Sequence, residues 1–193
     1  MTAKAWIRMI EPEEASDPFL RKMYELVKTP HGTVDNVMKA HSLRPRTMEG
    51  HVVLYRSVLH NDELTLPLWF LEVVASYVSM LNNCAYSLFH HFRNAASLMA
   101  DEARSTAVRA ALEARAPERA FAGKELALLR YAEKLTVAVG AMAKEDADAL
   151  HAAGAEDGEI LEVNQVCAYF NYSNRLLNGL GVTTKGDRIG FYD

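Results

Sequence analysis

The sequence has few of the residues that interrupt helices or cross-link small folds: 10 glycines, 6 prolines and 2 cysteines in 193 residues. Two cysteines, Cys84 and Cys167, cannot build a disulfide framework, so a hydrophobic core has to hold the fold together. Half of the residues are hydrophobic and 24% are charged, a globular balance that argues against disorder. We expect a folded protein with two free thiols.

Features that would mark other classes of protein are also missing. The formal net charge is -4, and the Lys and Arg residues form no basic stripe with interleaved aromatics, which argues against a nucleic-acid partner. No apolar run reaches about 18 residues, so no membrane span is predicted. The first residues lack the apolar stretch and cleavage site of a signal peptide, and a cytoplasmic protein is expected.

Helix formers (Ala, Leu, Glu, Arg and Met) fill the stretches between the few breakers, and no segment shows sustained period-2 alternation. This pattern predicts an all-α, compact multi-helix bundle, one domain over residues 1–193 with its motif region at about 45–100. Residues 5–10 are expected to form a short extended arm, and 101–120 a short surface helix and linker. Longer helices are expected at about 18–29, 34–40, 45–59, 67–81, 84–99, 121–139, 144–153 and 157–178.

Punctuating residues set several of these boundaries. Asp17 followed by Pro18 is typical of a helix N-terminus, and Pro45 opens another helix in the same way. Asp157 is expected to cap the last helix. The Asn82–Asn83 pair predicts a break between two helices.

Cys84, Ser87 and His91 follow that break at offsets of three and seven residues. At about 100° per residue, these offsets place all three side chains on one helix face. A cysteine at a helix start gains from unpaired N–H groups and the helix dipole, which predicts a lowered pKa. A nearby histidine can accept the thiol proton or stabilise the thiolate. The spacing thus predicts a thiol–imidazole site.

Glu72 can join this site only if the chain turns back at Asn82–Asn83, because on one straight helix it would be rotated about 120° from Cys84. It stands in an apolar run, Trp69 to Ala75, where a buried carboxylate is costly unless it is paired. The alternative is a glutamate on the solvent edge of its helix.

The whole pattern, Glu72-x11-Cys84-x2-Ser87-x3-His91, resembles the alkylhydroperoxidase D-like (carboxymuconolactone decarboxylase) superfamily, and its peroxidase-related subgroup in particular. The surrounding segments fit this subgroup too: 10–15, 32–37, Leu66-Pro67, 78–86, 129–136 and 170–182. The resemblance implies an all-helical antioxidant oxidoreductase that forms homo-oligomers and reduces peroxides with a dithiol, needing no cofactor. In that family the second cysteine of the pair attacks the peroxide, the first resolves the sulfenic acid, and His and Glu relay the proton.

Ser87 departs from the family pattern, because it stands where the attacking cysteine should be. A serine hydroxyl cannot form a sulfenic acid, so the usual dithiol cycle cannot run. Cys84 matches the resolving cysteine of the family, but the attacking cysteine that it would resolve is missing. One hypothesis keeps peroxidase-like chemistry on Cys84, with His91 and Glu72 in support and Cys167 or an external thiol as resolver. Cys167 is more readily read as a core residue.

Two further hypotheses remain open. Glu72, His91 and Ser87 could transfer protons on a small carboxylated or carbonyl substrate, as in a decarboxylase, lyase or isomerase, with Tyr86 and His90 adding hydrogen bonds. Alternatively the chain is a catalytically silent oligomer that binds an apolar ligand or partner. His90 points about 100° away from His91 and could instead be an interface or surface residue. A metal site is disfavoured, because adjacent histidines diverge and no His-x3-His or His-Glu-x2-His pattern occurs.

Overall fold

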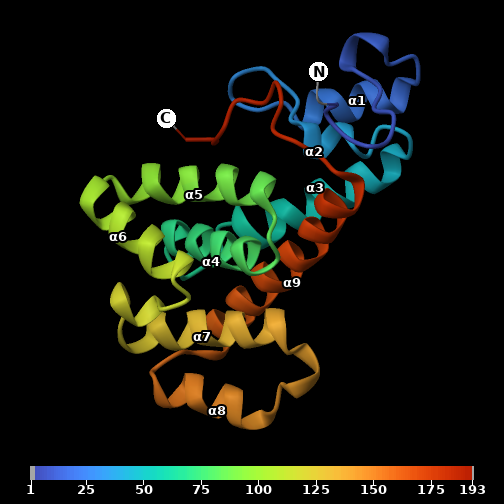
Figure 1. Cartoon of the computed structure of the whole chain (residues 1–193). Coiled ribbons are helices and arrows are strands. Elements are labelled where there is room, and N and C mark those ends of the chain that lie inside the picture. The colour runs from blue at the N-terminus through green and yellow to red at the C-terminus, as the bar shows by residue number, and fades with distance from the viewer. Residues whose placement is uncertain (1–2, 193) are drawn as a thin grey trace.

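The computed structural model describes residues 3–192, and over that range it contains nine α-helices, three short 3₁₀ turns and no strand (Figure 1). The expected all-α fold is confirmed. The helices are α1 (Pro18–Leu26), α2 (Asn36–Lys39), α3 (Pro45–Leu59), α4 (Leu68–Leu81), α5 (Ala85–Met99), α6 (Glu102–Glu113), α7 (Gly123–Val137), α8 (Lys144–Ala152) and α9 (Asp157–Leu180).

Helix α4 is the centre of the fold. It packs against α5, α7 and α9, with α5 on one side and α7 on the other (Figure 1). Its apolar side chains surround the whole helix and are buried, which is expected of a helix with no polar face. Burying a Leu or Phe side chain contributes about 1.5–3 kcal/mol, so this helix carries much of the folding free energy. Any polar residue on α4 therefore has to find its partner inside the protein.

The predicted break at Asn82–Asn83 is confirmed and turns α4 back into α5. Asn83 adopts a left-handed conformation (φ 52°), which Asn tolerates better than most residues. The Cys84 N–H donates to the Ser79 carbonyl at 2.8 Å and closes the turn. Asn178 of α9 donates to the Asn82 carbonyl at 3.0 Å, so the turn is tied to a third helix.

Several other boundaries follow the sequence signals. Asp17 accepts a hydrogen bond from the Phe19 N–H at 2.8 Å and caps α1, and Pro45 begins α3. The last helix begins at Asp157 but its capping residue is Glu156, one residue earlier than expected. The reason is a backbone contact at the helix start: the Glu156 N–H donates to the carboxylate of Glu159 at 3.0 Å.

Residues 101–120 contain α6, a helix of 12 residues that is mostly exposed, followed by the 3₁₀ turn Pro117–Arg119. Helix α6 buries one face, Ser105, Val108, Ala111 and Leu112, against α4 and α5. These positions keep helical spacing, but two of the four are small residues, so the apolar stripe is weak in the sequence. The arginines of α6 occupy its other faces.

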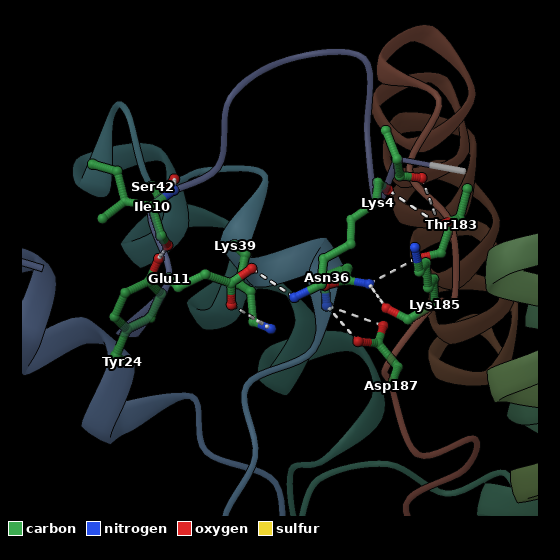
Figure 2. A network of polar contacts seen from close by, with 11 residues as sticks. Lys4, Ile10, Glu11, Tyr24, Asn36, Lys39, Ser42, Thr183, Lys185 and Asp187 are labelled. Carbon is green, nitrogen blue, oxygen red and sulfur yellow. Dashed lines mark hydrogen bonds and ion pairs between the residues drawn. The ribbon is translucent and has the colours of Figure 1, made fainter. Parts of the chain in front are cut away.

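Both ends of the chain are attached to α2 through a polar network (Figure 2). The buried amide of Asn36 donates to the carbonyls of Thr183 and Lys185 at 2.9 and 3.0 Å, and its backbone N–H donates to the Asp187 carboxylate. Lys39 and Lys4 both pair with Glu11, at 3.1 and 2.6 Å. The network fixes the C-terminal tail, residues 182–192, beside α2 and α5.

Gly181 ends α9 in a left-handed conformation (φ 60°), and a Cβ there would lie 2.2 Å from the Trp6 ring. Replacing Gly181 with Ala should lower the free energy of unfolding by about 1–2 kcal/mol, because a left-handed residue with a Cβ is strained and Trp6 has to move. Gly179, inside the helix with open space around its Cα, is the matched control, and Gly179→Ala should be neutral or stabilising. Urea unfolding of both variants tests this; equal effects at the two positions would contradict it.

Candidate active site

The hairpin of α4 and α5 brings Glu72 and His91 together. The Nδ1 atom of His91 lies 2.6 Å from Oε2 of Glu72, and the Asn94 amide donates to Oε1 at 3.1 Å. Glu72 is 0% exposed, so the alternative of a glutamate on the solvent edge is wrong. A buried carboxylate without partners would be strongly destabilising, and here both oxygens have a donor. Sequence spacing missed Asn94, although it lies one turn after His91.

The Glu72 contact sets the tautomer of a neutral His91. A carboxylate accepts hydrogen bonds, so a neutral ring donates through Nδ1 and leaves Nε2 as an acceptor. The ring packs edge-on against Phe170, with 4.5 Å between ring centroids, and stands near Tyr55 at 6.3 Å. His91 is therefore held by Glu72 and packed against aromatic rings.

Ser87 lies one turn before His91 and is buried. The two residues line one cavity of about 400 Å³. Its hydroxyl is 2.9 Å from the Ser79 hydroxyl, which itself lies 2.7 Å from the Ala75 carbonyl. The Asn174 amide donates to Ser79 at 3.3 Å. Ser87 is thus part of a hydrogen-bonded chain that reaches from the cavity into α4 and α9.

Cys84 does not share this cavity. It is 1% exposed and lines a separate pocket with Tyr77, Met80 and Leu112. Within residues 3–192, no hydrogen bond joins its thiol to His91 or to the Ser87 hydroxyl. Helical periodicity predicted that Cys84 would share a face with Ser87 and His91. It does not apply to Cys84, because this residue is the N-cap, with φ −98° and ψ 88°, and is not part of the helix.

The expected activation of the Cys84 thiol is also wrong. Burial raises the pKa of Cys84, and the Ser87 N–H facing the sulfur lowers it by less. Cys167 is a core residue of α9, as expected, and burial raises its thiol pKa as well. Both cysteines are free thiols, and they belong to different hydrophobic clusters.

A cavity of about 400 Å³ adjoins Ser87 and His91. Tyr86 and His90 of α5 line it, where the sequence placed them as substrate-binding candidates. His90 is 8% exposed, so the surface alternative for it is wrong. The aromatic and imidazole side chains that the sequence analysis did not single out are His51, Tyr55, His60, Tyr169 and Phe191, which come from α3, α9 and the C-terminal tail.

Part of the cavity wall has a recognisable spacing in the sequence. His51 and Tyr55 lie four residues apart on α3, and therefore on one face of that helix. Nothing in the sequence connects them with α5, because α3 reaches the cavity only through its packing on α9 and α4. Phe191 reaches it through the tail, where its N–H donates to Asn94 at 2.7 Å.

The cavity wall keeps its imidazoles neutral. Burial lowers the pKa of His51 to about 3 and that of His90 to about 4. Burial raises the pKa of Asp35 to about 7, and the neighbouring Asp187 carboxylate adds to the effect. Among residues 3–192 no cluster of three or more His, Cys, Asp or Glu side chains could hold a metal ion. Within the same range no helix is long and apolar enough to cross a membrane.

Comparisons with solved structures place this architecture in a known fold. No family model and no curated protein matches the sequence. An uncharacterized peroxidase-related protein from Ralstonia eutropha JMP134, described as an alkylhydroperoxidase AhpD core, has a TM-score of 0.81 at 18% identity, over 97% of this chain and 95% of that one. A peroxidase-related protein from Silicibacter sp. TM1040 gives 0.80 at 21% identity, over 96% and 94%.

A third structure is that of the debrominase Bmp8, with a TM-score of 0.73 at 14% identity, over 96% of this chain and 94% of that one. A cysteine-to-alanine variant of this debrominase has been solved in complex with 2,3,4-tribromopyrrole, and it matches with a TM-score of 0.70 at 15% identity. The chain therefore has the alkylhydroperoxidase D-like fold, as its motifs indicated.

The buried imidazoles predict a loss of stability in mild acid. The pKa of His51 is lower in the folded than in the unfolded protein, so the unfolded state binds more protons as the pH falls below about 6.5. Its contribution should fall by about 2 kcal/mol between pH 7 and pH 5. His41 and His90 act in the same direction, and Asp35 in the opposite one.

Urea unfolding at the two pH values measures this effect. His51→Gln should show a smaller difference between pH 7 and pH 5 than the wild type. The same substitution at His151, whose side chain is 47% exposed, is the control and should leave the difference unchanged. An unaltered difference in His51→Gln would show that His51 is not the group responsible.

Proposed function

We propose that the protein is a small-molecule enzyme that uses Glu72 and His91 for proton transfer on a planar ring substrate. The observation that carries this is the contact of His91, which lines the cavity, with the buried Glu72 behind it. In this site Nε2 of His91 takes a proton from an N–H or O–H of the substrate, and Glu72 stabilises the resulting imidazolium. The same proton then returns to a ring atom, so the step is a tautomerisation with no net gain of electrons.

The cavity walls support a flat, largely apolar substrate. Tyr55, Tyr169 and Phe191 offer aromatic surface, and the unprotonated imidazoles and Ser87 offer hydrogen bonds without charge. A volume of about 400 Å³ suits a compact ring compound. The tribromopyrrole complex of the debrominase shows that a protein of this fold binds such a ring, and the proposal extends that ligand class to this chain.

Peroxide reduction is the second candidate, since two of the structural neighbours are peroxidase-related proteins. The site argues against it in two respects. Ser87 stands in the attacker's place, and the Cys84 thiol is buried outside the cavity with a raised pKa. A thiol that stays protonated and has no access to the substrate is a poor nucleophile.

Hydrogen exchange tests the proton-transfer proposal directly. With 2,3,4-tribromopyrrole in D₂O, the wild type should speed up deuterium incorporation at the ring C–H, followed by NMR. His91→Gln should slow the enzymatic rate by about 100-fold, and Glu72→Gln by about 10- to 100-fold, because the base or its charged partner is lost. Exchange no faster than in buffer, for a probe shown to bind, contradicts the proposal.

A parallel experiment separates the two candidates. Cys84→Ser should leave the exchange rate unchanged, and the wild type should not consume cumene hydroperoxide in the presence of dithiothreitol. Ser87→Cys should gain peroxide consumption, because it places a thiol in the cavity beside His91, and its thiolate would be stabilised there. Peroxide consumption by the wild type that disappears in Cys84→Ser would instead favour the redox candidate.

A further inference from the structure

Asp35 stands at the N-cap of α2 but does not act as a cap. Its side chain accepts no hydrogen bond from the helix, and the Asn36 N–H donates to the Asp187 carboxylate, at 3.1 and 3.0 Å (Figure 2). An aspartate at this position normally stabilises a helix by about 1 kcal/mol through such a bond. The capping role has passed to the C-terminal tail, so the Asp35 carboxylate has no structural task in the helix.

The Asp35 carboxylate is also poorly compensated. Its Oδ1 atom is buried and has no hydrogen-bond partner. The nearby Asp187 carboxylate repels it, and Lys39, a cation that offsets this charge, is already paired with Glu11 at 3.1 Å. Leaving a buried acceptor unpaired costs about 1–3 kcal/mol, so the arrangement opposes folding.

His90, which lines the same cavity as Asp35, also has a buried polar atom without a hydrogen-bond partner. It stacks on Tyr86 with 4.8 Å between ring centroids, and its buried Nε2 has no hydrogen-bond partner. The nearest anionic oxygen, Oδ2 of Asp187, is 3.9 Å away, too far for a hydrogen bond. The buried His90 and the half-buried Asp35 each have one buried polar atom without a partner, and both line one cavity.

This polar wall and the proton-transfer pair serve the same cavity. Both groups act on Tyr55. Burial is the main reason why the pKa of its hydroxyl is raised, and the charges of Glu72 and Asp35 raise it further. Ser87, His90 and His91 come from successive turns of α5, so a ring seated against this helix can reach all of them. The unsatisfied atoms are placed where a bound ring would present its polar edge.

We propose that Asp35 is the specificity-determining acceptor for the substrate: its Oδ1 receives a hydrogen bond from a ring N–H or phenolic O–H, with His90 completing the polar wall. The ligand class is a planar ring with one hydrogen-bond donor on its edge, and a ring that lacks the donor is disfavoured. This inference rests on the proposed function for its substrate class, but it concerns binding and not proton transfer.

The test compares two probes, 2,3,4-tribromopyrrole and its N-methyl derivative, by calorimetric titration of the full chain at pH 8, above the pKa of about 7 of the Asp35 carboxyl. The wild type should bind the N–H probe at least about tenfold more tightly, since a hydrogen bond to a charged acceptor is worth more than a neutral one. Asp35→Asn should weaken binding of the N–H probe by about tenfold, Asp35→Ala by more, and neither should alter binding of the N-methyl probe. Asp62→Asn, at an exposed loop position, is the matched control and should change nothing.

Stability supplies a second readout that a purely structural role would not give. Without ligand at pH 8, Asp35→Asn should raise the melting temperature, because it removes a buried charge that faces Asp187. Equal affinity of wild type and Asp35→Ala for the N–H probe, or no binding of that probe by the wild type, would overturn the proposal. A fall in melting temperature for Asp35→Asn would also overturn it, since the carboxylate would then be structural.

The two proposals fail separately. If His91→Gln loses hydrogen exchange but keeps the preference for the N–H probe, both stand. If the wild type shows the preference without any exchange, the proton-transfer function fails and the role of Asp35 remains. Exchange without any preference between the probes would remove the Asp35 proposal alone.

Discussion

The contact between Glu72 and His91 is the constraint around which the rest of the fold is arranged. Helix α4 is buried on all sides, so its one carboxylate needs two donors from inside the protein, and α5 provides both His91 and Asn94. This requirement fixes the register of the hairpin, and the Asn82–Asn83 turn provides the reversal. Removing either donor would leave one oxygen of this buried carboxylate without a partner, which costs about 1–3 kcal/mol. Since Asn94 also accepts the Phe191 N–H, the same contact determines where the C-terminal tail lies.

The cavity beside this pair lowers the stability of the fold, because several polar atoms around it are buried without a hydrogen-bond partner. His51, His60 and His90 each bury a ring nitrogen without a partner, and Asp35 buries a carboxylate oxygen in the same state. A core selected for stability alone would pair or replace such groups. Of the seven buried side-chain atoms without a hydrogen-bond partner in residues 3–192, four belong to residues that line this cavity, and the others belong to Asn36, His41 and Tyr77. A cluster of unpaired groups on one cavity is typical of a site whose partners arrive with a ligand.

Ser87 and Cys84 lie in different surroundings. Ser87 lines the cavity and joins a chain of hydrogen bonds through Ser79, whereas Cys84 lines another pocket and burial raises its thiol pKa. In this chain the alkylhydroperoxidase D-like fold therefore presents a Glu–His pair beside a cavity that the thiol does not line. Structures of the same fold that differ this much in sequence, at 14–21% identity, leave room for such divergence.

What the sequence determined by itself is the local structure and the pairing that depends on it. Proline, asparagine and glycine placed most helix ends. The break at Asn82–Asn83 allowed Glu72 and His91 to share a site, with a solvent-facing glutamate as the alternative, and the structure decided between the two. The position of the Cys84 thiol was not predictable in this way, since helical periodicity stops at an N-cap residue. Only the tertiary structure decided the cavity, the task of Asp35 and the wall formed by α3, α9 and the tail. Helix α3 ends at Leu59 and α9 begins at Asp157, and burial and packing, not local propensity, bring these distant segments together.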